Sequence, residues 1–321
     1  MRLASALVTL VAAAVVAVPA SASQLVDRNA HGVTLAVDSG GHALISYVAA
    51  GRRRHVLAWG AVDARQPTES VPQVKLRLDY SGGWGTFRRQ LWRTFVNRCT
   101  PYTGPPLAFQ VATCTAPDGT YWALQAWQVP LPDLGFAPWT PQQRALELHV
   151  SHWSGPVAQL EAHTDWVYGG RYQEVFGRVT YRGNPVYGFH TTRYGAPLEG
   201  YGRLVYLDTL DSVYGNGWRR ENSFVTHNPT GVFCYGFYRF DPSSGGYVHP
   251  PTWSDHALRG PGTGSAYRLT VEGPGVTPDV STTIPGLHPY DPANASDATY
   301  EQQQNTLRRS LAANDRLCQH D

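Results

Sequence analysis

Short runs in which apolar and polar residues alternate, each closed by Gly, Pro, Asn or Asp, recur along almost the entire chain. Examples are GVTLAVD (32–38), ALISYVA (43–49) and TYWALQAWQV (120–129). Such alternation places successive side chains on opposite faces of an extended strand, which suits a sheet with one buried face. The chain also contains 32 Gly and 24 Pro, residues that favour turns over long helices. We therefore expect an all-β fold, mainly antiparallel and sandwich-like.

Two lobes are expected within this fold. Residues 129–141, VPLPDLGFAPWTP, hold four prolines and show no strand or helix periodicity. We interpret them as a connection between an N-terminal β lobe (23–128) and a C-terminal β lobe (142–321). In the first lobe, runs 32–38, 43–49 and 55–62 predict a meander, and Asp118-Gly119 predicts a hairpin turn. In the second lobe, Ser296 is the predicted cap of one C-terminal helix over about 296–317.

The first 22 residues have the composition of a secretory signal peptide. Arg2 is followed by an apolar run from Leu7 to Val18, and the small residues 20–22 form an A-x-A cleavage site before Ser23. The apolar run is shorter than the roughly 20 residues that span a bilayer. We expect an exported protein, extracellular or associated with the cell envelope, with no transmembrane segment after cleavage.

Four cysteines in an exported chain predict two disulfides. Cys99 and Cys114 flank a short loop rich in Pro and Gly, which two extended arms could close. Cys234 would then pair with Cys318 and attach the C-terminal helix to a strand. The competing interpretation, a Cys/His metal site, lacks any C-x-x-C spacing.

The densest cluster of ionisable side chains falls on two alternating runs, RALELHV (144–150) and AQLEAHTDW (158–166). Joined through the turn at 154–156, they are expected to pair as a hairpin with one polar face. That face carries five potential metal ligands: Glu147, His149, Glu161, His163 and Asp165. Imidazole and carboxylate groups within reach of one another can hold a divalent metal or act as general acid and base. The alternative is a solvated face whose side chains pair across the strands.

Two Tyr/Gly segments resemble each other. FGRVTY (176–181) matches YGRLVY (201–206), and VYG follows each of them, at 186–188 and 213–215. Each copy has the pattern of a strand, a turn and a strand. We expect two related hairpins in one sheet, because a solenoid needs about three repeats or more.

Two weaker sites accompany the polar face. The loop LDTLDSVYGNG (207–217) offers hard oxygen ligands of the kind calcium prefers, without EF-hand spacing: Asp208, Asp211 and Asn216. The chain is also rich in aromatics, with 10 Trp and 18 Tyr, and three of these are candidates for stacking on a ligand: Trp166, Tyr168 and Trp218. The structural alternatives are a polar turn for the first set and core packing for the second.

The sequence indicates the function of the protein less directly than it indicates the fold. The chain lacks the G-x-S-x-G and H-E-x-x-H signatures, which favours a non-catalytic protein, and its net charge of +2 gives no field that would attract nucleic acid. We expect a secreted or envelope-associated binding protein for glycan or cell-wall polymer, with no required cofactor. One alternative is an extracellular hydrolase that uses a divalent metal on the His149/His163 carboxylate face. Another is a structural surface protein.

Overall fold

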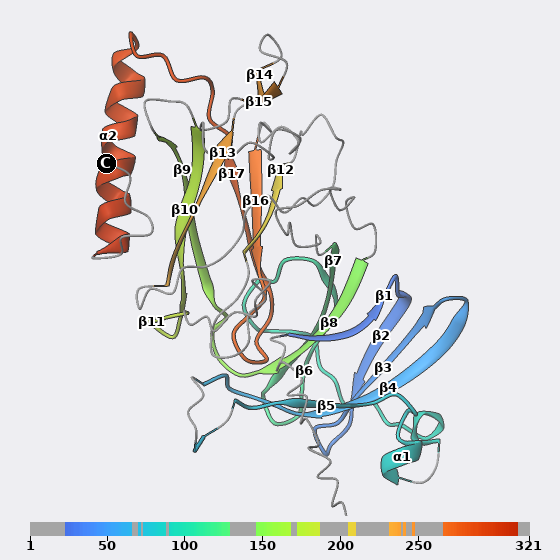
Figure 1. Cartoon of the computed structure of the whole chain (residues 1–321). Coiled ribbons are helices and arrows are strands. Elements are labelled where there is room, and N and C mark those ends of the chain that lie inside the picture. Colours follow the sequence, from blue (N-terminus) through green and yellow to red (C-terminus); the bar gives the residue numbers. More distant parts are fainter. Residues whose placement is uncertain are drawn as a thin grey trace, which may run out of the picture.

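The computed structural model confirms an all-β fold with one C-terminal helix (Figure 1). It describes residues 23–65, 70–71, 73–87, 90–128, 146–167, 172–186, 205–209, 231–238, 240–241, 246–247 and 266–313. Every strand pair within these ranges is antiparallel, in agreement with the alternating sequence.

The N-terminal lobe is a sandwich of two four-stranded sheets. One sheet has the order β2-β3-β4-β5 and consists of β2 (His31–Val37), β3 (Ala43–Ala49), β4 (Arg52–Gly60) and β5 (Leu76–Asp79). The other has the order β1-β8-β7-β6 and consists of β1 (Gln24–Arg28), β8 (Leu146–Trp153), β7 (Tyr121–Gln128) and β6 (Gln110–Thr115). The predicted meander is confirmed as β2, β3 and β4, and the predicted hairpin as β6 and β7.

Alternate side chains of these strands build the core of the lobe. Ile45 and Val56 from one sheet pack in the same buried cluster as Trp122 and Leu148 from the other. The β6–β7 hairpin closes through Gly119, whose φ of 82° lies in the left-handed region that favours glycine. The local pattern of the sequence therefore sets both the buried face and the turn.

The C-terminal lobe has two further sheets and a short ribbon. In the first sheet, β10 (Tyr172–Tyr181) lies between β9 (Gln159–Val167) and β13 (Val232–Tyr238), and its end pairs with β11 (Asn184–Pro185). The second sheet consists of β12 (Val205–Thr209), β16 (Ala266–Val271) and β17 (Val280–Pro285). The ribbon pairs β14 (Phe240–Asp241) with β15 (Gly246–Tyr247). Val175, Val179 and Leu269 share the buried core of the two sheets.

The helix α2 (Ala295–Ala312) packs against β9 and β10 (Figure 1). Leu311 and Ala312 of the helix meet Phe176 and Val232 of the sheet in a buried cluster. The predicted helix is confirmed, but its N-cap is Asn294, whose side chain accepts a hydrogen bond from the Ser296 amide. Among the described residues, no helix is long and apolar enough to cross a membrane. Two short helical turns, α1 (Trp84–Phe87) and η1 (Leu91–Arg93), follow β5.

The predicted hairpin between residues 144–150 and 158–166 is wrong. β8 pairs with β1 on one side and β7 on the other, whereas β9 pairs with β10. β8 therefore belongs to the N-terminal lobe, although the sequence placed residues 142 onward in the C-terminal lobe. Alternation defines the two faces of a strand, but it does not specify the neighbouring strand. The pairing of β8 with β1 and β7 could therefore not be predicted from the local sequence.

The two Tyr/Gly segments lie in different sheets rather than side by side. The first copy forms β10 and the described part of the second copy forms β12. The glycine of the first copy, Gly177, has a packing role, because a Cβ there would collide with the Glu161 carbonyl and the Phe233 ring. The VYG at 213–215 lies outside the described residues.

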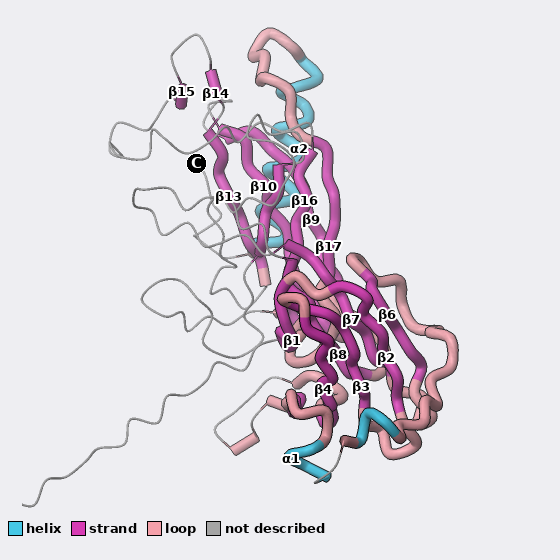
Figure 2. The backbone as a smooth tube through the Cα atoms, turned by 90° about the vertical axis from the view of Figure 1, so that its right-hand side faces the viewer, coloured by secondary structure: helices cyan, strands magenta, loops and turns pink. Residues whose placement is uncertain are grey.

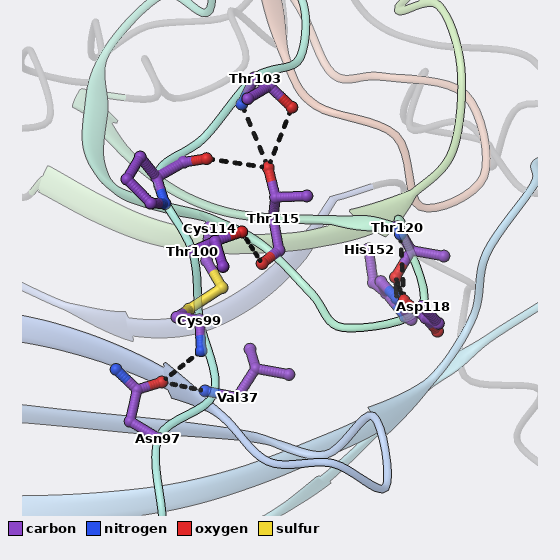
Figure 3. Close-up of a disulfide and its surroundings, with 11 residues drawn as sticks. Val37, Asn97, Cys99, Thr100, Thr103, Cys114, Thr115, Asp118, Thr120 and His152 are labelled. Atoms are coloured by element: carbon purple, nitrogen blue, oxygen red, sulfur yellow. Dashed lines mark hydrogen bonds between the residues drawn. A yellow bond between two sulfur atoms is a disulfide. The ribbon is translucent and has the colours of Figure 1, made fainter.

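The predicted disulfide between Cys99 and Cys114 is present and ties the loop after η1 to β6 (Figure 3). The Cα atoms of the two cysteines are 5.5 Å apart. Asn97 fixes the same loop, since its Oδ1 accepts hydrogen bonds from the Val37 amide at 3.0 Å and the Cys99 amide at 2.9 Å (Figure 3). Cys234 is also disulfide-bonded, and its predicted partner, Cys318, lies outside the described residues.

The two lobes are stacked end to end (Figure 2). At their junction, each lobe contributes a side chain to the buried core of the other. The loop between β16 and β17 reaches down to β8, where Val276 joins the core of the N-terminal lobe (Figure 1). In the opposite direction, Ala64 from the β4–β5 connection joins the core of the C-terminal lobe. A Cβ at Gly275 would lie only 2.5 Å from the Ala64 Cβ, so the two insertions meet closely.

Because Val276 is a buried side chain of one lobe's core supplied by the other lobe, Val276→Ala should destabilise the junction. We expect the free energy of unfolding to fall by about 1–3 kcal/mol, from the loss of buried methyl groups and the resulting cavity. Denaturant unfolding followed by tryptophan fluorescence measures it. The matched control is Val111→Ala, an exposed position, which should change stability by no more than about 0.5 kcal/mol. Equal losses of stability in Val276→Ala and Val111→Ala would contradict the burial of Val276 in the core of the N-terminal lobe.

Candidate functional site

The five residues of the predicted metal face are divided between the lobes. Glu147 and His149 lie on β8, whereas Glu161, His163 and Asp165 lie on β9. Because the hairpin does not form, the two sets do not face each other across a strand pair. Among the residues that the structure describes, no three His, Cys, Asp or Glu side chains gather as a metal site. The predicted single site is therefore corrected to separate local clusters.

The β9 pair is partly exposed. His163 Nε2 lies 3.2 Å from Glu161 Oε1, and Arg178 lies 3.5 Å from the other oxygen of the same carboxylate. The His163 ring also stacks on Phe176. Ion pairs of this kind at a surface contribute little to stability. Glu161, His163 and Arg178 therefore fit the alternative interpretation, in which polar side chains of a solvated face pair with one another.

The predicted ligand-stacking residues and the predicted calcium loop are described only in part by the structure. Trp166 is only 3% exposed: its ring stacks on His288, and its Nε1 donates to the His288 carbonyl at 2.9 Å. It is a core residue between β9 and the start of α2, so its predicted role in ligand stacking is wrong. Tyr168 and Trp218 lie outside the described residues. Asp208 is on β12, opposite Arg268, while Asp211 and Asn216 lie outside the described residues.

A buried polar network occupies the junction of the lobes. Ser23, His149 and Asp279 are 1%, 2% and 1% exposed. The Ser23 hydroxyl donates to Asp279 Oδ1 at 2.5 Å and lies 2.8 Å from His149 Nδ1. His149 Nδ1 is also 3.1 Å from Asp279 Oδ2, and its Nε2 is 3.3 Å from Glu147 Oε2. Arg28 closes the chain of charges with a 2.6 Å contact to Glu147.

Asp279 is the centre of this network. Its carboxylate accepts hydrogen bonds from Trp127 Nε1 at 2.7 Å and from the Gly273 amide at 3.1 Å. Its backbone is held as well, because the Gln125 side chain accepts from the Asp279 amide and donates to its carbonyl, both at 2.8 Å. Sequence analysis found Glu147 and His149 but missed Ser23 and Asp279. These residues meet only through tertiary packing, and no local motif connects them.

The charges of the network support one another. Burial alone would lower the pKa of His149, but the Asp279 carboxylate, with help from Glu147, raises that pKa to about 10. Burial would raise the pKa of Asp279, but the adjacent imidazolium and the hydrogen bonds from His149, Ser23 and Trp127 hold it below its ordinary value. The pKa of Glu147 is likewise lowered, against the effect of burial, by hydrogen bonds from His149 and Arg28. At neutral pH the network is an ionised, hydrogen-bonded group.

The arrangement contains a serine, a histidine and an aspartate, but it is unsuited to hydrolysis. A general base must accept the hydroxyl proton, and the protonated His149 has no free nitrogen for it. The near-complete burial of Ser23 also keeps its oxygen away from any substrate. The network instead joins β1, β8 and the β16–β17 loop across the lobe junction.

A second buried group lies beneath α2. Arg308 of the helix makes a 2.8 Å ion pair with Glu174 of β10, and both side chains are 1% exposed. Beside them, Asp165 of β9 has a buried Oδ2 without a hydrogen-bond partner within the described part of the chain. Burial, together with the negative charges of Glu174 and Glu301, raises the pKa of Asp165 to about 7.

Aromatic residues with exposed or partly exposed rings follow β5 along the chain. Tyr80 and Trp84 are 54% and 57% exposed, in contrast to the buried Trp166. Trp92 stacks on His55 of β4 with ring centroids 4.4 Å apart, and the Arg93 guanidinium lies 5.0 Å from the centroid of the Trp92 ring. We call Tyr80, Trp84, Trp92 and Arg93 the aromatic surface. The segment that carries it lies at the end of the molecule away from α2 (Figure 1).

Comparisons with protein-family models, with curated proteins and with solved structures find no match for this chain. The site must therefore be interpreted from its own residues.

The junction network predicts a pH dependence that His149→Gln should remove. The folded protein holds the His149 proton more tightly than the unfolded chain, so this contribution is complete below pH 6.5 and is lost as the pH rises towards about 10. We expect the parent to exceed the variant in unfolding free energy by a few kcal/mol at pH 6, and this difference to shrink by pH 10. Urea unfolding across this range measures it. A difference that is constant with pH would contradict a protonated His149.

Asp165→Asn should behave in the opposite sense and stabilise the protein. The folded state binds the Asp165 proton up to about pH 7, whereas the unfolded chain releases it near 3.8, so ionisation weakens folding as the pH rises through this window. We expect the variant to gain little at pH 4 and about 1–3 kcal/mol at pH 8. Thermal melts at both pH values measure this, with Asp118→Asn at an exposed turn as the control. A loss of stability at pH 8 would contradict the burial of this carboxyl.

Proposed function

We propose that the protein is an exported, non-catalytic glycan-binding protein and that the aromatic surface is its binding site. The observation that supports this most directly is Trp84, a large indole ring that is 57% exposed at the start of the short helical turn α1. Aromatic rings of this size are normally withdrawn into cores or interfaces, as Trp122 and Trp166 are here. An exposed ring on an ordered loop is therefore a candidate for a ligand contact.

The loop that carries Trp84 is held in place before any ligand arrives. The Asp79 carboxylate accepts a hydrogen bond from the Ser81 amide at 2.9 Å, and Ser81 Oγ in turn accepts one from the Gly85 amide at 2.7 Å. Gly82 allows close packing of this loop, because a Cβ there would lie 3.1 Å from His55 and 3.2 Å from Trp92. A prearranged site loses less conformational entropy when it binds, which favours affinity.

The composition of the surface suits a carbohydrate. Its rings can cover the C–H faces of a sugar, and the same segment also exposes the polar side chains of Ser81 and Thr94, which could bond to hydroxyl groups. Arg93 and Arg98 are exposed as well and could receive a carboxylate or phosphate on the glycan. A protein partner would instead favour a larger continuous apolar patch.

The partner we propose is a glycan or cell-wall polymer outside the cell. Export follows from the expected signal peptide at 1–22, and the Cys99–Cys114 disulfide suits an oxidising compartment. The same geometry argues against a metal-dependent hydrolase, because the expected metal face is divided between β8 and β9 and His149 is buried in its ion pairs.

Trp84→Ala should weaken binding to an insoluble glycan by about tenfold or more, since a stacked ring commonly contributes at least 1.4 kcal/mol at the centre of a site. Co-sedimentation with purified cell-wall polysaccharide and with peptidoglycan measures this. Tyr80→Phe is the matched control at the same surface, because it keeps the ring and removes only the hydroxyl that donates to the Val26 carbonyl. Binding by the parent that Trp84→Ala leaves unchanged, or no binding by the parent to either polymer, would overturn the proposal.

A further inference from the structure

The predicted cleavage site and the buried network meet at one residue. Ser23 is the first residue after the Ala20-Ser21-Ala22 site, and it is also the residue whose hydroxyl bridges His149 and Asp279. A new amino terminus is ordinarily exposed and loosely held. In the uncleaved chain Ser23 is 1% exposed, and its side chain is enclosed by His149 and Asp279, so cleavage at this site would create a charged group at the edge of the buried network.

Covalent geometry places that charge beside Asp279. The α-nitrogen of a serine is three bonds from its own Oγ, so the two atoms are no more than about 4 Å apart. The Ser23 Oγ is itself 2.5 Å from Asp279 Oδ1. An ammonium at Ser23 would therefore lie no more than about 6.5 Å from that oxygen, in or close to the range in which an opposite charge favours the ionised form.

The surroundings contain enough negative charge to receive it. Asp279 faces Ser23 directly, and Glu147 lies on the far side of the His149 imidazole. Glu272, at the start of the β16–β17 loop, also attracts His149. The cations that face the group are His149 itself and Arg28, which is bound to Glu147 at the exposed edge. A buried ammonium with a carboxylate partner is tolerated, whereas an unpaired one is strongly unfavourable.

We propose that removal of the leader is a step in folding: the freed α-ammonium of Ser23 pairs with Asp279 and completes the bond between the lobes. Peptide hydrolysis after Ala22 supplies the group, as water adds to the Ala22–Ser23 amide and leaves a carboxylate on Ala22 and an amine on Ser23. The uncleaved chain has at this position a neutral amide with a single N–H. The mature protein is therefore held together more firmly than its precursor, which would keep the precursor easier to unfold during export.

The proposal rests on the export proposed above, and its test does not. Three proteins are prepared with defined amino termini: one that begins at Ser23, the same protein with an acetylated α-amine, and one extended to Ala20. At pH 7 the free Ser23 form should melt a few degrees above the other two. The advantage should disappear above about pH 10, because an α-amine loses its proton there even when its ordinary pKa near 8 is raised by a carboxylate.

Two further variants identify the interaction. In a protein that begins with Ser23→Ala, acetylation should still lower the melting temperature, since the ammonium is retained and only the hydroxyl is lost. In Asp279→Asn, acetylation should have no effect; if this variant does not fold, the pH dependence decides. Equal melting of the free and acetylated forms at pH 7, or an advantage that persists unchanged to pH 11, would overturn the proposal.

Discussion

The buried carboxylate of Asp279 is the interaction on which the assembly of the two lobes depends. An ionised carboxylate without partners would be strongly unfavourable in a dry interior, but here it faces an imidazolium, an indole N–H and a backbone N–H. These donors come from β8, from β7 and from the β16–β17 loop that carries Asp279 itself. The charge can therefore be buried only when both lobes are folded and docked. The exchange of Val276 and Ala64 between the two cores adds apolar contact to the same junction.

Two of the buried acidic side chains, Asp279 and Asp165, differ in how completely their hydrogen bonds are satisfied. Asp279 is saturated with donors and stays ionised, whereas Asp165 lies beside Glu174 with one oxygen unpartnered among the described residues. The difference arises from charge: Asp279 faces a cation, and the Arg308 guanidinium near Asp165 is already bound to Glu174. The junction network is thus most stabilising in mild acid up to about pH 6.5, where its carboxylates are ionised and His149 holds its proton. The buried Asp165 beneath α2 is likewise best tolerated below its pKa of about 7.

The proposed binding surface and the buried network lie in different parts of the molecule, the first at one end and the second between the lobes. The aromatic surface lies on a loop of the N-terminal lobe, over the sheet that contains β4, and the network lies where that lobe meets the other. A loop that is supported by a sheet and by its own hydrogen bonds can expose an indole ring without losing its shape. The buried junction, in contrast, has no access to a ligand and serves to hold the scaffold.

Much of the fold could be predicted from the sequence because it is local. The β2–β4 meander, the Asp118-Gly119 hairpin, the terminal helix and the Cys99–Cys114 disulfide each involve residues close in the chain. The candidate site was less accessible. Alternation correctly placed Glu147 beside His149, but whether β8 would pair with β9 or with β1 and β7 depends on the packing of whole sheets. Likewise, composition showed an excess of aromatics, and only burial distinguished Trp166 from Trp84. Tertiary structure decided which distant residues meet, as Ser23, His149 and Asp279 do. The reason is that a buried charge needs an opposite charge or a hydrogen-bond donor close to it in the folded protein, wherever that group lies in the sequence.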